Sequence, residues 1–137
     1  MYKENAQKLA DILTSLIADT KLQAVYNYDM KESNVYPFAM VRVKDWESDF
    51  FDTSENEMTS TYMISVINQN TKVATSEVVM RELVDEILLE LNKKENLTLW
   101  GTVNRIIPRT IAWGWSETNE SVRICDITIE VNENIWV

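Results

Sequence analysis

An acidic stretch from Asp45 to Glu57 is the densest group of residues that could do chemistry, because it contains carboxylates and no base. Its acids are Asp45, Glu47, Asp49, Asp52, Glu55 and Glu57. Carboxylates at alternate positions resemble the start of a calcium loop. That loop needs glycine at its sharp turn, where Phe50 stands, and a bidentate glutamate at its end, where Asn56 stands. We therefore predict no metal and no cofactor, and a solvated hairpin tip remains the simplest interpretation.

Three large apolar side chains lie among these charges: Trp46, Phe50 and Phe51. A small monomer buries aromatic rings poorly in an acidic loop, whereas a neighbouring molecule covers them well. The alternative to a solvated tip is thus a contact surface for another subunit or partner.

The sequence lacks the residues on which most catalytic sites depend. It contains no histidine, which rules out Ser-His-Asp and Cys-His arrangements, and two glycines cannot form a glycine-rich phosphate loop. Asp126 and Glu130 suggest a carboxylate pair. Positions i and i+4 of a strand lie roughly 13 Å apart, however, beyond the roughly 5–9.5 Å of glycosidase pairs. We interpret them as the outer face of a surface strand, and we predict that the protein is not an enzyme.

Two arginines, Arg105 and Arg109, interrupt an otherwise apolar alternation carried by Val103, Ile107, Ile111 and Trp113. Pro108 between them removes a backbone donor, which predicts an edge strand or a bulge. Two interpretations stay open. Either the bulge turns both arginines toward water, or the edge is kept free for another subunit whose carboxylates they bind.

Other apolar residues raise the same question of burial or contact. Trp113 and Trp115 share a face across Gly114, where the missing side chain permits close approach, and packing in the core or at its rim is the default. Trp136 lies in an apolar C-terminal tripeptide that must dock on the domain or be covered by a partner. Cys125 is the only cysteine, so it forms no internal disulfide, and we expect it to be buried and inert.

Apolar residues at helical spacing predict two helices. The stronger runs from Thr75 to Glu95 and carries Met80, Leu83, Val84, Ile87, Leu88 and Leu91. The other runs from Glu4 to Asp19 and carries Ala6, Leu9, Ala10, Leu13, Leu16 and Ile17. A stripe as wide as that of the stronger helix needs a large apolar partner surface, which we expect to be a sheet.

The remaining segments read as strands. They are 22–28, 38–44 (apolar on both faces and therefore central), 58–68, an extended stretch over 97–115, and 122–131. The sequence thus predicts one α+β domain over residues 1–137: a mainly antiparallel sheet with two helices packed on it, in the order α-β-β-β-α-β-β, with a long acidic hairpin.

Composition excludes several classes of partner. The formal net charge of -9 argues against a protein that grips nucleic acid by its phosphates. The longest apolar run, Phe38 to Val41, is far shorter than the roughly 18 residues of a membrane span, and no secretory signal is evident. A lone cysteine fits a reducing compartment.

This combination resembles the tail terminator (tail completion, or neck) proteins of long-tailed bacteriophages. The likeness lies in the order and size of the elements and in their acidity. It includes the N-terminal helix, the first long strand Tyr36-Pro37-Phe38-Ala39-Met40-Val41-Arg42-Val43, the acidic hairpin, the second helix, and a closing pair from Arg105-Ile106-Ile107-Pro108 to Trp115 and from Arg123 to Val131.

The resemblance implies a homo-oligomeric ring, usually of six copies, that caps the tail tube and meets the head connector. Its partners would be the tail tube protein and the head connector protein, and its location the host cytoplasm during assembly and then the virion tail or neck. The lumen of such rings is acidic, which lets DNA slide past by like-charge repulsion. The acidic hairpin would suit that lumen or the tube, and Arg105 and Arg109 a ring interface. Another neck or connector subunit and a small α+β ligand-binding domain remain as alternatives.

Overall fold

The computed structural model describes residues 2–18, 20, 22–28, 36–50, 55–69, 73–93, 95–99, 101, 103–115 and 122–136, and within these the side chains of all but 2, 45–50, 55–57, 73–76 and 134–136. Its elements follow the predicted order and confirm the α+β fold class. They are α1 (Tyr2–Thr14), β1 (Ala24–Tyr26), β2 (Phe38–Phe50), β3 (Glu55–Gln69), α2 (Val73–Leu91), β4 (Arg105–Trp115) and β5 (Val122–Trp136).

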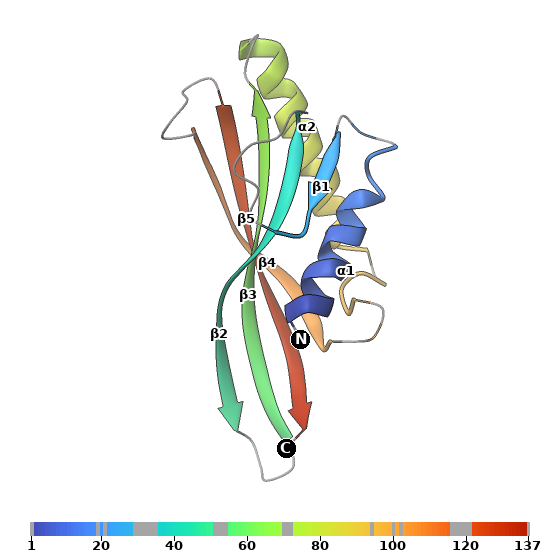
Figure 1. Ribbon diagram of the computed structural model, residues 1–137, viewed down its shortest axis with the longest axis vertical. Coiled ribbons are helices and arrows are strands. Elements are labelled where there is room, and N and C mark those ends of the chain that lie inside the picture. The colour runs from blue at the N-terminus through green and yellow to red at the C-terminus, as the bar shows by residue number, and fades with distance from the viewer. Residues whose placement is uncertain are drawn as a thin grey trace.

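The strands form a single sheet in the order β1-β2-β3-β5-β4 (Figure 1). All neighbouring pairs are antiparallel except β1 and β2, which are parallel. β1 is short and pairs with β2 only from Phe38 to Met40. The sheet therefore has β4 along one margin, and at the other margin β1 covers only the start of β2.

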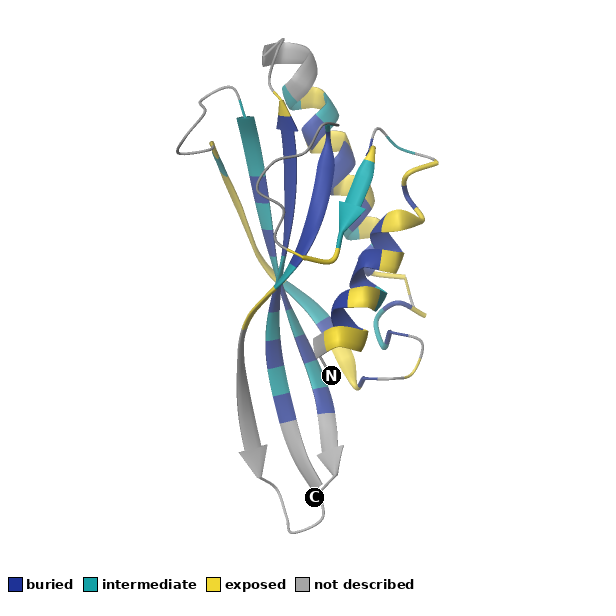
Figure 2. Ribbon diagram, in the orientation of Figure 1, coloured by how far each residue is buried: buried dark blue, intermediate teal, exposed yellow. Residues whose placement is uncertain are grey.

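Both helices lie on one side of this sheet, here called the inner face (Figure 1). The predicted stripe of α2 is buried against it, with five of its six residues at most 3% exposed and Leu88 partly buried. The sheet contributes the alternate residues of its central strands to the same core: Tyr62, Ile64, Val66, Cys125, Ile127, Ile129 and Val131. The core thus forms where the apolar stripe of the helices faces the alternate apolar residues of the strands (Figure 2).

A smaller apolar cluster lies on the opposite, outer face of the sheet. Phe38, Met40 and Ile67 are buried there, with Tyr26 and Tyr36 packed against them. The rings of Tyr26 and Tyr36 both contact Phe38, at centroid distances of 5.8 and 5.6 Å. The start of β2 is therefore apolar on both faces, as its sequence predicts.

Both helices end earlier than their sequence patterns predict. The backbone tightens after Thr14, where Leu16 N donates to Leu13 O and Ile17 N to Thr14 O. As a result Leu16 is still buried, but Ile17 is 36% exposed and does not belong to the core stripe. No described helix is long and apolar enough to cross a membrane.

The described residues between 95 and 104 form a compact turn, which corrects the prediction of extended chain from Leu97 onward. Leu99 N donates to Asn96 O and Gly101 N to Thr98 O. Gly101 has a φ of 83°, a conformation that glycine adopts without steric cost. The turn buries Leu99 completely, so it closes the core beneath the helices before β4 begins.

The acidic stretch is mostly strand, which corrects its prediction as a connection. β2 and β3 remain paired from Asp45 opposite Thr61 to Phe50 opposite Asn56, and β5 continues beside β3 as far as Trp136 opposite Glu55. A ladder of backbone hydrogen bonds can continue without a buried face, and alternate acids and aromatics fit strand spacing as well as loop spacing.

Truncating the α2 stripe should destabilise the fold far more than truncating the exposed side of the same helix. Ile87→Ala removes a side chain that is 0% exposed and should lower the free energy of unfolding by roughly 2–5 kcal/mol. Leu89→Ala, at a side chain 64% exposed, should change it by less than about 0.5 kcal/mol. Urea unfolding followed by circular dichroism measures both, and equal losses would contradict this packing.

Candidate functional site

β4 is the part of the described sheet that presents the most unusual surface. It is an edge strand, and its register against β5 shifts between Pro108 and Thr110, so the predicted edge position and the predicted bulge are both present. The shift changes which residues share a face. Ile107 lies opposite Glu130 on the outer face, whereas Ile111 lies opposite Ile127 on the inner face. The alternation of residues 103–113 therefore changes face within the strand, in line with the interpretation that a bulge shifts the faces.

The two arginines of β4 are both exposed on the outer side. Arg109 Nε lies 2.9 Å from Glu130 Oε2, an ion pair whose side chains are 50% and 34% exposed. Arg105 lies opposite Asn132 at the start of the strand. Solvated pairs of this kind contribute little to stability. Both guanidinium groups are thus accessible to carboxylates of another molecule.

Trp113 and Trp115 lie on the inner face beside α2, where Arg123 of β5 holds them. The Arg123 guanidinium carbon is 5.3 Å from the Trp113 ring centroid and 4.8 Å from that of Trp115. Arg123 Nη1 also donates to Gly114 O at 3.1 Å. A guanidinium stacked on aromatic rings is attracted by their π-electrons, so these contacts fix the orientation of both indoles.

Glu77 of α2 completes this cluster. Its Oε1 lies 2.7 Å from Arg123 Nε, with both side chains 17% exposed, and the contact is an ion pair without an aligned N–H···O hydrogen bond. Sequence reasoning missed both residues. Extending the inward alternation of β5 by two positions from Cys125 would have placed Arg123 on the inner face, but its partners depend on the tertiary fold.

These contacts do not bury the tryptophans. Trp113 remains 40% exposed, Trp115 46% and Ile111 42%, and together they form what we call the β4 stripe. Figure 2 shows that β4 is exposed along most of its upper part, beyond the cover of the helices. Nothing lies within 4 Å of where a Gly114 side chain would begin, so the predicted close approach at that glycine is not used.

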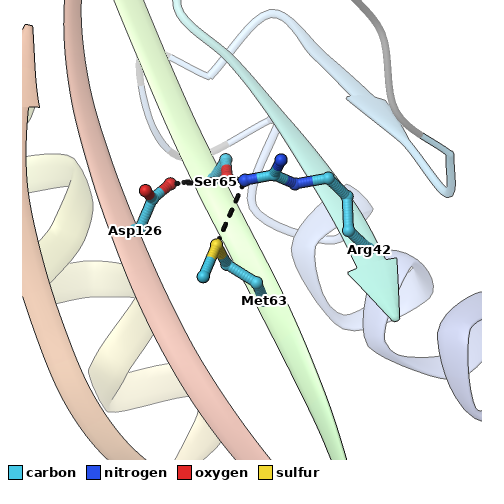
Figure 3. A network of polar contacts seen from close by, with 4 residues as sticks. All are labelled: Arg42, Met63, Ser65 and Asp126. Atoms are coloured by element: carbon cyan, nitrogen blue, oxygen red, sulfur yellow. Dashed lines mark hydrogen bonds and ion pairs between the residues drawn. The ribbon is translucent and has the colours of Figure 1, made fainter. Parts of the chain in front are cut away.

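The outer face carries a polar network (Figure 3). Arg42 Nη2 donates to Ser65 Oγ at 2.7 Å, Ser65 Oγ donates to Asp126 Oδ1 at 2.6 Å, and the Arg42–Asp126 ion pair measures 3.7 Å. Arg42 Nη2 also lies 3.1 Å from the sulfur of Met63. Asp126 is thus paired with Arg42, and Glu130 with Arg109, so each acid of the supposed carboxylate pair has a cation as its partner.

This network is poorly suited to catalysis. Ser65 is 1% exposed, and no histidine is available to remove its proton. A nucleophile must be reachable by substrate and activated by a nearby base. Among the residues whose side chains are described, no three Cys, Asp or Glu side chains are grouped to hold a metal ion.

Cys125 is buried in the main core, as predicted. Burial, with a further contribution from the charge of Asp126, raises the pKa of its thiol to about 12. The thiolate is the reactive form of cysteine, so this side chain is unreactive at neutral pH.

Several predicted contact residues cannot be placed as side chains. The backbone positions of Asp45, Trp46, Glu47, Asp49 and Phe50 belong to β2, those of Glu55 and Glu57 to β3, and that of Trp136 to β5, but their side chains lie outside the described set. Phe51 and Asp52 lie outside the described residues altogether. Their predicted roles at an interface or a lumen remain predictions.

Comparison with known proteins finds a likeness in fold. No protein-family model and no curated protein matches the sequence. Among solved structures, the chain is similar to one in a structure described as "Virion of native gene transfer agent (GTA) particle", with a TM-score of 0.50 and 14% sequence identity. The match covers 90% of this chain and 84% of that chain. At this identity the likeness shows a shared fold.

The raised pKa of Cys125 predicts that its thiol reacts slowly in the folded protein. Between pH 8 and 9 the folded protein should react with a thiol reagent roughly a thousandfold more slowly than the protein in denaturant, because the thiolate fraction falls about tenfold for each pH unit between the ordinary pKa of about 8.5 and the raised value. Rates of labelling, with and without urea, measure this. Similar rates in both conditions would contradict the burial.

Proposed function

We propose that this protein is a non-enzymatic structural component of a virion that works by joining copies of itself into a ring. The β4 stripe is the observation that carries the proposal. Ile111, Trp113 and Trp115 are large apolar side chains left 40–46% exposed along an edge strand, one margin of which no described strand covers. Contiguous apolar surface on a soluble protein marks a site of association, and aromatic residues are enriched at such interfaces.

The likeness in fold supports a virion setting, because it extends over 90% of this chain and the matched chain comes from a virion particle. The resemblance in element order and acidity to phage tail terminators supports a more specific role. In that role the ring caps the tail tube and meets the head connector protein, first in the host cytoplasm and then in the neck of the virion. Six copies are the number that this resemblance implies.

The net charge of -9 supports an anionic channel in the ring. We assign the acids of the β2–β3 hairpin to the lumen or to the tube-facing surface, because like charge keeps a passing DNA from adhering. The aromatics of the same segment, Trp46, Phe50 and Phe51, fit contact with a neighbouring subunit or the tube better than a bare lumen.

A small ligand-binding domain is the second candidate, and one observation favours it. A hollow of about 430 Å³ lies between the end of β1, α1 and β2, lined by Ala6, Asn27, Tyr28, Val41, Arg42, Val43, Lys44 and Met63. Its size is within the usual range for ligand pockets. Exposed residues such as Tyr28 and Val43 line it, at 54% and 47%, which suits a contact surface better than an enclosing pocket.

The oligomeric state separates these functions. We expect the purified protein, alone or with tail tubes, to form a ring-sized species by light scattering and rings with a central hole by electron microscopy. A strict monomer under all these conditions, with a small molecule bound in the hollow, would favour the second candidate and remove the first.

Charge reversal tests the proposed part of the arginines in that ring. Arg105→Glu combined with Arg109→Glu should weaken the oligomer by roughly tenfold or more in the concentration at which it forms, because like charges across an interface repel. Lys3→Glu, at an exposed side chain of α1, is the control and should leave the oligomer intact. A ring unaffected by the double reversal would exclude these arginines from the interface.

A further inference from the structure

The sheet has two margins that no described strand covers, and they differ in chemistry. One is the edge of β4 that points away from β5. The other is the edge of β2 beyond Met40, where the pairing with β1 stops. An open strand margin presents unpaired N–H and C=O groups to any strand that can lie beside it. Two different open margins on one molecule allow a head-to-tail contact, which closes into a ring when the rotation between copies is right.

The open part of β4 is its second half. At its start the Ile106 N–H donates to Leu97 O at 2.7 Å, so the turn 95–104 occupies that end of the margin. Pro108 then offers no donor. Beyond it, Thr110 to Trp115 pairs with β5 on one side, has no described strand on its other side, and carries the β4 stripe on the inner face.

The open part of β2 begins where β1 ends and adjoins the hollow described above. Val43 lies opposite Tyr62, an inner-face residue, yet it is 47% exposed. Tyr28, 54% exposed, lines the same hollow. Val43 and the β4 stripe thus leave apolar side chains uncovered on the inner face at both open margins, whereas Tyr28 packs against Tyr26 of the outer cluster, at a ring-centroid distance of 5.6 Å. Joining the margins would cover Val43 and the stripe.

Charge also distinguishes the two margins. β4 carries Arg105 and Arg109, both before its open half, and no acid, whereas β2 after Lys44 carries Asp45, Glu47 and Asp49 and no base. Opposite charges across an interface select the partner and fix the register. Two β4 strands paired around a two-fold axis would instead make a closed dimer rather than a ring.

We propose that copies of this chain join head to tail, with the open margin of β4 in one copy lying antiparallel beside the open margin of β2 in the next. The inference rests on the ring proposed above and names the surface that builds it. β4 and β2 run in opposite directions within one copy, so copies related by rotation about an axis along the strands meet with antiparallel polarity. The open segments lie at different heights along the sheet, so the strands must tilt relative to that axis, as in a closed barrel.

A pair of cysteines tests this contact directly. Ala112→Cys and Lys44→Cys, both at exposed positions, are placed in the same chain. Within one copy β3 and β5 separate these strands by roughly 14 Å, too far for a disulfide, so any bond must join two copies. Native Cys125 stays in place because it is buried. Mild oxidation should give a ladder of linked chains on a non-reducing denaturing gel, ending at the ring size and lost on reduction.

Two controls make the outcome decisive. Lys44→Cys with Glu86→Cys, on the exposed side of α2, should give no ladder, and Ala112→Cys alone should give no linked dimer. Rings seen by electron microscopy without a ladder from the first pair, or with an equal ladder from the control pair, would overturn this contact while leaving the ring. Linked dimers from Ala112→Cys alone would show β4 paired with β4 and overturn it too. Absence of any ring would overturn both proposals.

Discussion

The apolar contact between the helices and the inner face of β3 and β5 is the constraint on which the rest of the structure depends. It buries the alternate residues of both strands and nearly all of the α2 stripe. The helices leave the second half of β4 uncovered, and large apolar side chains stay exposed there.

The cluster around Arg123 is a consequence of that incomplete cover. The inward alternation of β5 brings Arg123 under the edge of α2, where Glu77 neutralises it and the two indoles stack on it. A half-buried cation is costly without such partners. The same contacts hold the tryptophans in defined positions while leaving close to half of each exposed, so a partner would meet a rigid surface and lose little side-chain freedom on binding.

The sequence predicted the elements whose apolar residues recur with the regular period of a helix or a strand. The stripe of α2 and the alternation of β5 were correct residue by residue, because both record burial against the same core. The continuation of β2 and β3 through the acidic residues was not predicted, since backbone pairing, rather than burial, extends them. A bulge near Pro108 that shifts the faces was among the predictions, but the position of the extra residue was not, because it depends on the register with β5. Arg123 was missed because its partners come from two separate segments, α2 and β4.

Each margin strand contains one break in register, between Val43 and Asp45 in β2 and between Pro108 and Thr110 in β4. Such breaks sharpen the local twist and shorten the stretch over which another strand can pair with even spacing. The strands of newly synthesised, still unassembled chains are thereby hindered from pairing with one another into open-ended fibres. The kinks that shape these strands would then act as a safeguard for solubility before any partner is met.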